Sequence, residues 1–256
     1  MLDEEKWKTA ISKIGRGEIR VRGYDIAQMM EKLTFAQAVF LILKGELPNQ
    51  AQSKIMEAIL VSSIDHGATP PSALATRTVI SGGNPINASI AGGILAIGDS
   101  HGGAIEQCAK KLQQAIKEGA DLGHKAREIV KHLVEQDKKM PGFGHRIHKV
   151  DPRATKLFQL SNKFGISGEH TKLILAIQKE LAQQTGKEIP INVDGAIAAV
   201  ISDMGFDWKL GKGFFIISRT PGLLAHAYEE LTREKLMRNL GNTDPEYDGT
   251  GEREIG

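Results

Sequence analysis

Residues 140–153, Met-Pro-Gly-Phe-Gly-His-Arg-Ile-His-Lys-Val-Asp-Pro-Arg, combine the residue types of an active site for a small organic acid. Gly142 and Gly144 allow the backbone to come close to a ligand and to offer it N–H groups. His145 can transfer a proton near neutral pH, and Arg153 can hold a carboxylate through two parallel hydrogen bonds. The segment therefore predicts an acid–base group and a carboxylate clamp, with an ordinary surface loop as the alternative.

A second histidine, His101, precedes a predicted helix within the sequence Asp-Ser-His-Gly-Gly at residues 99–103. The positive end of a helix dipole favours the neutral imidazole, which can donate a hydrogen bond to a developing oxyanion. The two glycines that follow leave room for a ligand beside the backbone. The alternative is an ordinary helix cap, with Asp99 or Ser100 as the N-cap residue.

Two charged side chains lie in apolar sequence nearer the C-terminus. Asp194 is part of the mainly apolar segment 189–196, where desolvation would raise the pKa of a carboxyl group and suit it to move the proton of a carbon acid. It could instead be a helix N-cap, with Asn192 hydrogen-bonding locally. Arg219 ends a predicted apolar helix, where its charge needs a partner. That partner is either a substrate carboxylate or a protein salt bridge.

Further candidates carry an imidazole or an amine. His66, in Asp-His-Gly at residues 65–67, follows a predicted apolar helix. It either serves a site or sits at the helix C-terminus, where the dipole favours histidine and glycine ends the helix. Lys149 could meet a phosphate, and both Lys149 and His148 could equally be solvated.

Helical periodicity dominates the sequence and supplies the elements that must position these groups. Apolar residues recur at helical spacing in six segments, at residues 34–45, 51–64, 104–118, 125–136, 170–185 and 223–239. Alternation typical of a strand occurs at residues 18–24 and predicts a short hairpin or edge strand. We therefore expect an all-α protein with a minor β element near the N-terminus. Small residues at 88–96 predict either two closely crossing helices or a contact with a partner subunit.

Composition and the absence of several motifs exclude other function classes. The net charge is +2 with 25% charged residues, so no basic face for nucleic acid is predicted. No apolar stretch approaches the ~20 residues of a membrane span, and no signal-peptide core is expected. The single cysteine, Cys108, precludes an intrachain disulfide and fits a cytoplasmic protein. Spacings typical of metal sites, Walker loops and serine nucleophile elbows do not occur.

Taken in order, these segments resemble the site motifs of the citrate synthase superfamily through nearly the whole chain. Arg-Val-Arg-Gly-Tyr-Asp-Ile at residues 20–26 and Leu-Lys-Gly-Glu-Leu-Pro at residues 43–48 resemble that family's N-terminal signature. Its later motifs are matched at residues 65–66, 101–104, 141–145, 151–153, 192–194 and 218–219. Several independent motifs in one order make the resemblance specific.

The resemblance implies one citrate synthase-like unit over residues 1–256, assembled as a homodimer or larger homo-oligomer. A shortened large domain would span approximately residues 1–105 and 195–256, and a small helical domain approximately residues 106–194, with the site in the cleft between them. The implied catalytic residues are His101, His145 and Asp194. A four-carbon dicarboxylate would be held by His66, Arg146, Arg153 and Arg219, and coenzyme A by Pro141, Gly142, Phe143, Gly144 and Lys149.

One predicted helix separates Pro48 from Asp65, where full-length citrate synthases carry a longer helical stretch. In this respect the chain resembles the citryl-CoA lyase part of ATP-citrate lyase. The expected reaction is therefore the cleavage of citryl-CoA to oxaloacetate and acetyl-CoA. Because that lyase usually carries an aromatic residue in place of His101, a citrate or 2-methylcitrate synthase is the alternative. A non-catalytic citrate- or CoA-binding subunit is a further one.

The same resemblance sets the expected partners and setting. The small-molecule partners would be citryl-CoA, oxaloacetate and acetyl-CoA, with the coenzyme A thioester as substrate or product and no tightly bound cofactor. A separate citryl-CoA synthetase is a candidate protein partner, and no metal, nucleic acid or membrane is expected. The expected setting is cytoplasmic citrate metabolism, including a reductive tricarboxylic acid cycle.

Overall fold

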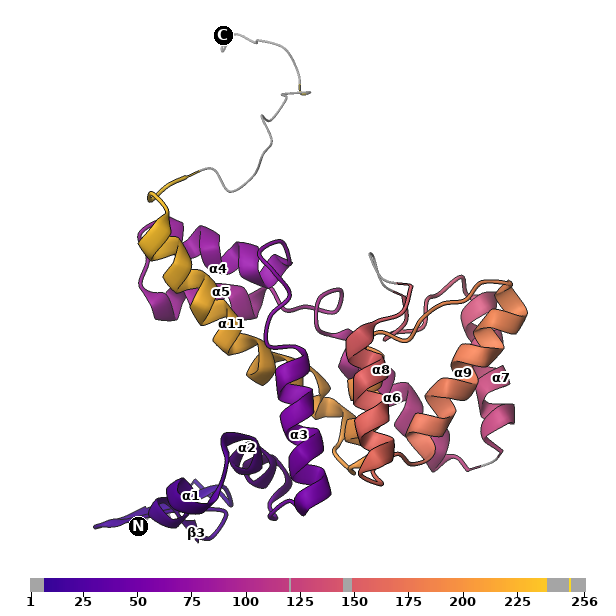
Figure 1. Ribbon diagram of the computed structural model, residues 1–256, viewed down its shortest axis with the longest axis horizontal. Helices are drawn as coiled ribbons and strands as arrows, with labels where there is room; N and C mark the ends of the chain where they lie inside the picture. Colours follow the sequence, from indigo (N-terminus) through magenta and orange to yellow (C-terminus); the bar gives the residue numbers. More distant parts are fainter. Residues whose placement is uncertain (1–6, 120, 145–148, 239–248, 250–256) are drawn as a thin grey trace, which may run out of the picture.

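The computed structural model describes residues 7–119, 121–144, 149–238 and 249. Within these ranges the chain forms eleven α-helices, one 3-10 helix and one three-stranded sheet. Figure 1 shows the helix α11 extending from α4 and α5 toward α6, with the sheet and α1 at the N-terminal end. The predicted all-α fold with a minor β element is confirmed. No helix in the described ranges is long and apolar enough to span a bilayer.

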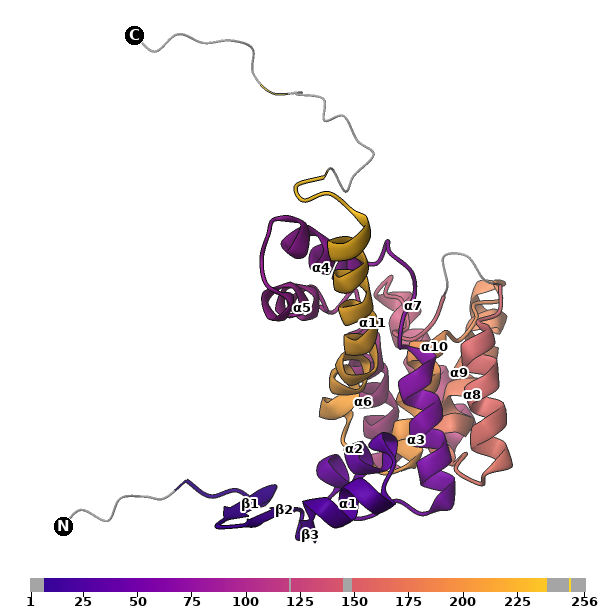
Figure 2. The ribbon, with the colours of Figure 1, turned by 60° about the vertical axis from the view of Figure 1, so that its left-hand side comes forward.

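The sheet is a small antiparallel meander at the N-terminus. Its strands, in the order β1-β2-β3, are β1 (Ser12–Gly15), β2 (Glu18–Val21) and β3 (Tyr24–Asp25). Ser12 pairs with Val21, and the tight turns between strands use the positive φ angles of Gly17 (74°) and Gly23 (88°), which glycine adopts readily. Figure 2 shows the sheet projecting beyond the helices, in agreement with the predicted short hairpin.

Three short helices follow, α1 (Ile26–Lys32), α2 (Phe35–Lys44) and α3 (Gln50–Ser62). Thr34 with Gln37, and Asn49 with Gln52, form capping boxes that satisfy the first backbone N–H groups of α2 and α3. Gly45 ends α2 with a left-handed backbone. Both helices confirm the predicted segments to within two residues.

The helices α4 (Pro71–Ser81) and α5 (Ile86–Leu95) cross at very short range. A Cβ atom on Gly93 would lie 2.0 Å from Oγ1 of Thr76, and one on Gly92 would lie 2.9 Å from a methyl group of Val79. The small residues of α5 therefore allow the two backbones to approach. Of the two predictions made for this segment, the close helix crossing is confirmed.

A second group of helices surrounds α10 (Val193–Asp203), which is buried along nearly its whole length. It packs against α6, α8 and α9. A helix that is apolar on all sides is expected in the middle of a core, and it gives a rigid support to side chains at its ends. The other members of this part of the chain are α6 (Ala104–Lys117), α7 (Leu122–Glu135), α8 (Pro152–Lys163), α9 (Glu169–Thr185) and a 3-10 helix (Trp208–Leu210).

The last helix, α11 (Gly211–Arg233), corrects two predictions. A helix over residues 223–239 was expected, but α11 begins earlier, ends earlier and runs through Pro221, so Arg219 lies inside it and not at a helix end. A proline inside a helix costs roughly 3 kcal/mol. Here Phe214 on one side of the proline and Leu223 and Ala227 on the other are all buried on the same helix, and this packing outweighs the local penalty.

Candidate active site

The Pro-Gly-Phe-Gly loop is fixed by backbone hydrogen bonds to the segment before α10. The N–H of Gly144 donates to the carbonyl of Pro190 (2.7 Å), and the N–H of Asn192 donates to the carbonyl of Gly142 (3.0 Å). The side-chain amide of Asn192 also donates to the Gly144 carbonyl (2.9 Å). Gly142 has a φ of 81°, and a Cβ there would lie 2.5 Å from Cα of Gly195. Two glycines on separate segments thus bring the loop directly against the first turn of α10.

Asp194 occupies that first turn. The N-cap of α10 is Asn192, whose side-chain oxygen accepts from the N–H groups of Asp194 (3.0 Å) and Gly195 (3.2 Å), so the reading of Asp194 as the cap is wrong. Burial raises the pKa of Asp194 to about 6; the charges of Arg153 and Arg219 act against this shift. This carboxyl group can therefore exchange a proton near neutral pH.

Arg153 lies in the first turn of α8 and is held by Asp151, which is fully buried. Its Nε donates to Oδ1 of Asp151 (3.1 Å) and its Nη2 to Oδ2 (3.0 Å). The same Oδ2 accepts from the N–H of Val193 at the start of α10 (2.9 Å). Burial alone would raise the pKa of Asp151, but the bonds from Arg153 and the backbone lower it below its usual value. Sequence reasoning missed this role for Asp151, although an Asp-Pro pair at a helix start is an N-cap signal.

Arg219 and His101 both contact the ring of Phe215. The guanidinium carbon of Arg219 lies 4.9 Å from the ring centre of Phe215, and the His101 ring packs edge-on against the same ring at 5.5 Å. His101 Nε2 is 2.8 Å from the hydroxyl of Ser72 on α4. Burial lowers the pKa of Arg219, whose Nε donates to the carbonyl of Ser63 (2.9 Å).

The remaining hydrogen-bonding capacity of Arg219 bears on its two predicted roles, a substrate clamp or a protein salt bridge. Its buried Nη1 has no hydrogen-bond partner among the described residues, and no carboxylate there lies within salt-bridge distance of it. A buried, unsatisfied guanidinium donor is costly unless a ligand accepts from it. This geometry favours the carboxylate clamp over the protein salt bridge.

Neither Asp99 nor Ser100 caps the helix that follows His101, so the interpretation of this segment as an ordinary helix cap is wrong. The helix α6 begins at Ala104 with Gly103 as its N-cap and without a side-chain cap, while Asp99 forms an ion pair with Lys212 (3.1 Å). His101 therefore sits in a turn just before the helix, with Gly102 against the Phe215 ring. Sequence reasoning missed Ser72 and Phe215, because each lies far along the chain from His101, which it orients.

The other predicted site residues are placed less centrally. His66 is exposed in the turn after α3, and because that helix ends at Ser62 the C-terminal cap reading is wrong. Lys149 is exposed at the rim of a cavity of about 630 Å³ that α8 and α9 line. His145 and Arg146, two further predicted site residues, lie outside the described residues.

A second cavity, of about 620 Å³, adjoins the glycine loop. Its lining includes Lys138, Lys139, Met140, Phe143 and Gly144. Two amines and a loop of backbone groups at the mouth of an apolar cavity suit a ligand that is apolar at one end and anionic at the other. Across the described residues, no three His, Cys, Asp or Glu side chains gather as they would around a metal ion.

The assembled site thus contains a carboxyl group that titrates near neutral pH, an oriented imidazole and two guanidinium groups. The charges of Arg153 and Arg219 both act on Asp194, and Arg219 is joined to His101 through Phe215. Proton transfer next to a bound carboxylate is the chemistry that these groups can perform.

Comparison with known proteins identifies the family of the chain. The family model described as "Citrate synthase, C-terminal domain" matches residues 4–54 and 49–240. The chain belongs to the citrate synthase family. Citrate synthase 2 of Bacillus subtilis is 29% identical over 90% of this chain and 59% of its own length, and the citrate synthase of Haloferax volcanii is 29% identical over 91% and 60%. The chain therefore spans about 60% of the length of these curated relatives.

Solved structures of this family extend the comparison. The citryl-CoA lyase from Hydrogenobacter thermophilus is 47% identical, with a TM-score of 0.91 over 98% of this chain and 97% of that one. The ATP citrate lyase from Methanothrix soehngenii, solved with citrate and coenzyme A, is 20% identical, with a TM-score of 0.81 over 98% of this chain and 43% of that one. At that identity the second structure supports the fold alone.

Proposed function

We propose that this chain is a citryl-CoA lyase, which cleaves citryl-CoA to oxaloacetate and acetyl-CoA. The observation that carries the proposal is the 47% identity to the Hydrogenobacter thermophilus enzyme across nearly the whole of both chains. Identity to the curated citrate synthases named above is 29%, over about 60% of their lengths.

The proposed reaction breaks the bond between the hydroxyl-bearing carbon and the carbon next to the thioester. His145 takes the proton of the tertiary hydroxyl, and that oxygen becomes the ketone of oxaloacetate. The electrons of the broken bond move into the thioester and form an enolate, whose oxygen accepts a hydrogen bond from His101. Protonated Asp194 then gives its proton to the enolate carbon, which becomes the methyl group of acetyl-CoA. One proton enters at His145 and one leaves at Asp194, so the step balances.

The described geometry supports these roles for two of the three groups. A pKa of about 6 leaves roughly one Asp194 in ten protonated at pH 7, enough for a general acid. Ser72 and the T-shaped contact with Phe215 hold the His101 ring in one orientation, as an oxyanion donor requires. The role of His145 rests on the resemblance of its motif.

The two guanidinium groups are proposed to bind the carboxylates of the four-carbon end. Arg153 is fixed by a buried carboxylate, and Arg219 carries an unsatisfied buried donor. Rigid, desolvated donors of this kind bind carboxylates strongly and in one orientation. His66 and Arg146 are proposed to complete this part of the site.

Coenzyme A is proposed to lie along residues 141–144. The cavity of about 620 Å³ beside Phe143 and Gly144 has room for an extended chain, and Lys138 and Lys139 at its edge could meet phosphates. Lys149, which lines the cavity of about 630 Å³ beside α8 and α9, is proposed as a further phosphate ligand.

Several broader features are also proposals. We infer a homodimer or larger homo-oligomer, because α4, α5 and α11 expose the large apolar side chains of Leu74, Leu95, Leu224 and Tyr228. Division into a large domain, residues 1–105 and 195–256, and a small one, residues 106–194, would allow a cleft to close and exclude water. A citryl-CoA synthetase partner, a cytoplasmic location and a reductive tricarboxylic acid cycle complete the proposal.

A citrate or 2-methylcitrate synthase is the second candidate, favoured by the curated synthases among the relatives. A synthase would use the same three groups in reverse and then hydrolyse the thioester. The deciding experiment supplies the purified chain with citryl-CoA, or with acetyl-CoA and oxaloacetate. Rapid formation of acetyl-CoA from citryl-CoA without free coenzyme A supports the lyase, and fast release of free coenzyme A from the second mixture contradicts it. Citrate binding without either reaction would indicate a non-catalytic subunit.

A further inference from the structure

One face of α11 contacts the end of α3 and then the connection between α3 and α4. The hydroxyl of Ser218 donates to the carbonyl of Leu60. One residue later, Arg219 Nε donates to the carbonyl of Ser63. At Gly222 a Cβ would lie 2.2 Å from the carbonyl of Ile64, so only glycine lets the connection pass this closely.

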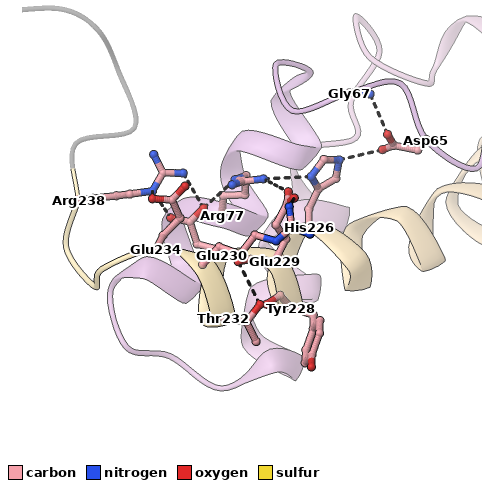
Figure 3. Close-up of polar contacts among 11 residues, drawn as sticks. Asp65, Gly67, Arg77, His226, Tyr228, Glu229, Glu230, Thr232, Glu234 and Arg238 are labelled. Atoms are coloured by element: carbon pink, nitrogen blue, oxygen red, sulfur yellow. Dashed lines mark hydrogen bonds and ion pairs between the residues drawn. The ribbon is translucent and has the colours of Figure 1, made fainter.

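The next contact along this face is made by His226. Its Nε2 lies 3.0 Å from Oδ1 of Asp65, and its Nδ1 lies 3.3 Å from Nη1 of Arg77 (Figure 3). A guanidinium group can only donate hydrogen bonds, so Nδ1 must accept from Arg77. In the neutral ring the proton is then on Nε2, which donates to Asp65. The hydrogen-bond network therefore selects one tautomer of His226.

Arg77 is itself held firmly. It is buried and donates to Glu230 through Nε (2.7 Å) and to Glu229 through Nη1 (2.9 Å). Glu230 also accepts from Nη2 of Arg238 (2.7 Å), which lies beyond the end of α11. Figure 3 shows this network running from Arg238 through Arg77 and His226 to Asp65. His226 is thus fixed at one end before it contacts the loop.

The Asp65 carboxylate spans the residue that follows it. While Oδ1 accepts from His226, Oδ2 accepts from the N–H of Gly67 (2.9 Å), whose φ is 82°. This is an Asx turn, and it folds the backbone around His66. Burial alone would raise the pKa of Asp65, but the N–H of Gly67 and the His226 ring lower it below its usual value, which keeps the acceptor ionised.

We infer that His226 is a positioning residue for His66: through Asp65 it fixes the turn that presents His66 to the carboxylates of the substrate. The inference rests on the proposed function, in which His66 binds the four-carbon end. The contact between His226 and Asp65 is therefore expected to affect the affinity for substrate and not the rate of the bond-breaking step.

The substitutions that test this differ in which hydrogen bond they keep. In His226→Gln the side-chain nitrogen reaches about as far as Nε2 and can still donate to Asp65. In His226→Asn the amide reaches only as far as Nδ1, so the bond to Asp65 is lost. Asp65→Asn removes the charge of the acceptor, and because this side chain is 39% exposed on a loop we expect only a small loss of stability. The control is Arg233→Gln. It removes an exposed cation of the same helix, and this cation pairs with Glu229.

Two quantities are measured, the Kd of citrate by calorimetry and the kcat and KM for citryl-CoA. We expect H226N and D65N to raise both the citrate Kd and the KM roughly tenfold, with kcat within about threefold of the parent. The reason is that the weakened contact binds the substrate and the transition state equally. H226Q and R233Q should stay within about threefold of the parent in every parameter.

Equal losses in H226Q and H226N, or an unchanged citrate Kd in H226N and D65N, would overturn the inference. If H226N does not fold, D65N decides alone. A parent that binds citrate but does not cleave citryl-CoA contradicts the proposed function, while the citrate titrations of the variants still test the positioning role. A parent that does neither overturns both.

Discussion

Replacing Asp194 with asparagine is expected to stabilise the fold while it abolishes most of the activity. Burial raises the pKa of Asp194 from its ordinary 3.8 to about 6. A carboxyl group whose pKa is raised in the folded state stabilises that state fully below pH 3.8, and this contribution is lost as the pH rises through 6. The ionised group therefore lacks about 3 kcal/mol of stability that the protonated group has. Asparagine has a similar shape and cannot ionise.

Measuring the unfolding free energies of the parent and D194N at two pH values isolates the contribution of the Asp194 ionisation. Urea denaturation of the parent and D194N at pH 4 and pH 8 gives the difference in unfolding free energy at each pH, and all other titrating groups are shared. At pH 4 the unfolded carboxyl is already partly ionised, so we expect the difference to move in favour of D194N by about 2 kcal/mol between the two values. A difference that does not change would mean that Asp194 ionises normally, and the reasoning about the site would be wrong.

The same variant tests the chemistry. Loss of a positioned general acid should lower kcat for citryl-CoA cleavage by roughly 10²–10⁴, whereas turnover within a few-fold of the parent would refute the role of Asp194. In the free enzyme the protonated fraction of Asp194 falls about tenfold per pH unit above pH 6, so kcat/KM for cleavage by the parent should decline as the pH rises above that value. A group acting as a base in condensation would instead gain activity as the pH rises through 6.

Three further outcomes follow from the packing around the site. Gly142→Ala should destabilise the fold by roughly 3 kcal/mol or more, because its Cβ would lie 2.5 Å from backbone, whereas Gly144→Ala, also at positive φ but with open space, should cost only about 1–2 kcal/mol by chemical denaturation. Asp151→Asn should lower the free energy of unfolding by about 2 kcal/mol, less than for a fully buried pair because Arg153 is 25% exposed. It should also raise the Kd of citrate measured by calorimetry. Cys108, whose thiol pKa burial raises, should react with a thiol reagent only after unfolding; rapid reaction in the native protein would contradict the burial.

Local signals were sufficient for much of the fold. Helices α2 and α3 combine an apolar stripe with a capping box, α9 ends at its C-cap Gly186, and Gly119 follows the C-cap of α6, so their bounds follow from the order of residues. Local signals failed at α11, where Pro221 and Gly222 look like a break. Gly222 is there because the Ile64 carbonyl passes against it, and no property of the local sequence contains that contact.

The candidate site likewise contains residues that local sequence predicts and residues that it does not. Asp194 and Arg153 could be proposed from their neighbours, because a carboxylate in apolar sequence and an arginine after a turn are unusual. The groups that orient the site could not, since Ser72 acts on His101 across 28 intervening residues and Asp151 bonds the backbone of Val193. Each contact joins two elements whose relative position is set only when the core has packed.

The charges around Asp194 imply that substrate binding itself promotes proton delivery. Burial raises the pKa of this carboxyl group, while Arg153 and Arg219 oppose the rise. A dicarboxylate bound to both guanidinium groups would neutralise that opposition and add negative charge nearby, so the pKa of Asp194 should rise further. Citrate binding at pH 7 should then be accompanied by proton uptake, which calorimetry in buffers of different ionisation enthalpy measures directly. The uptake should vanish in D194N; binding of citrate to the parent without any proton uptake would show that the arginines do not hold the carboxylates next to Asp194.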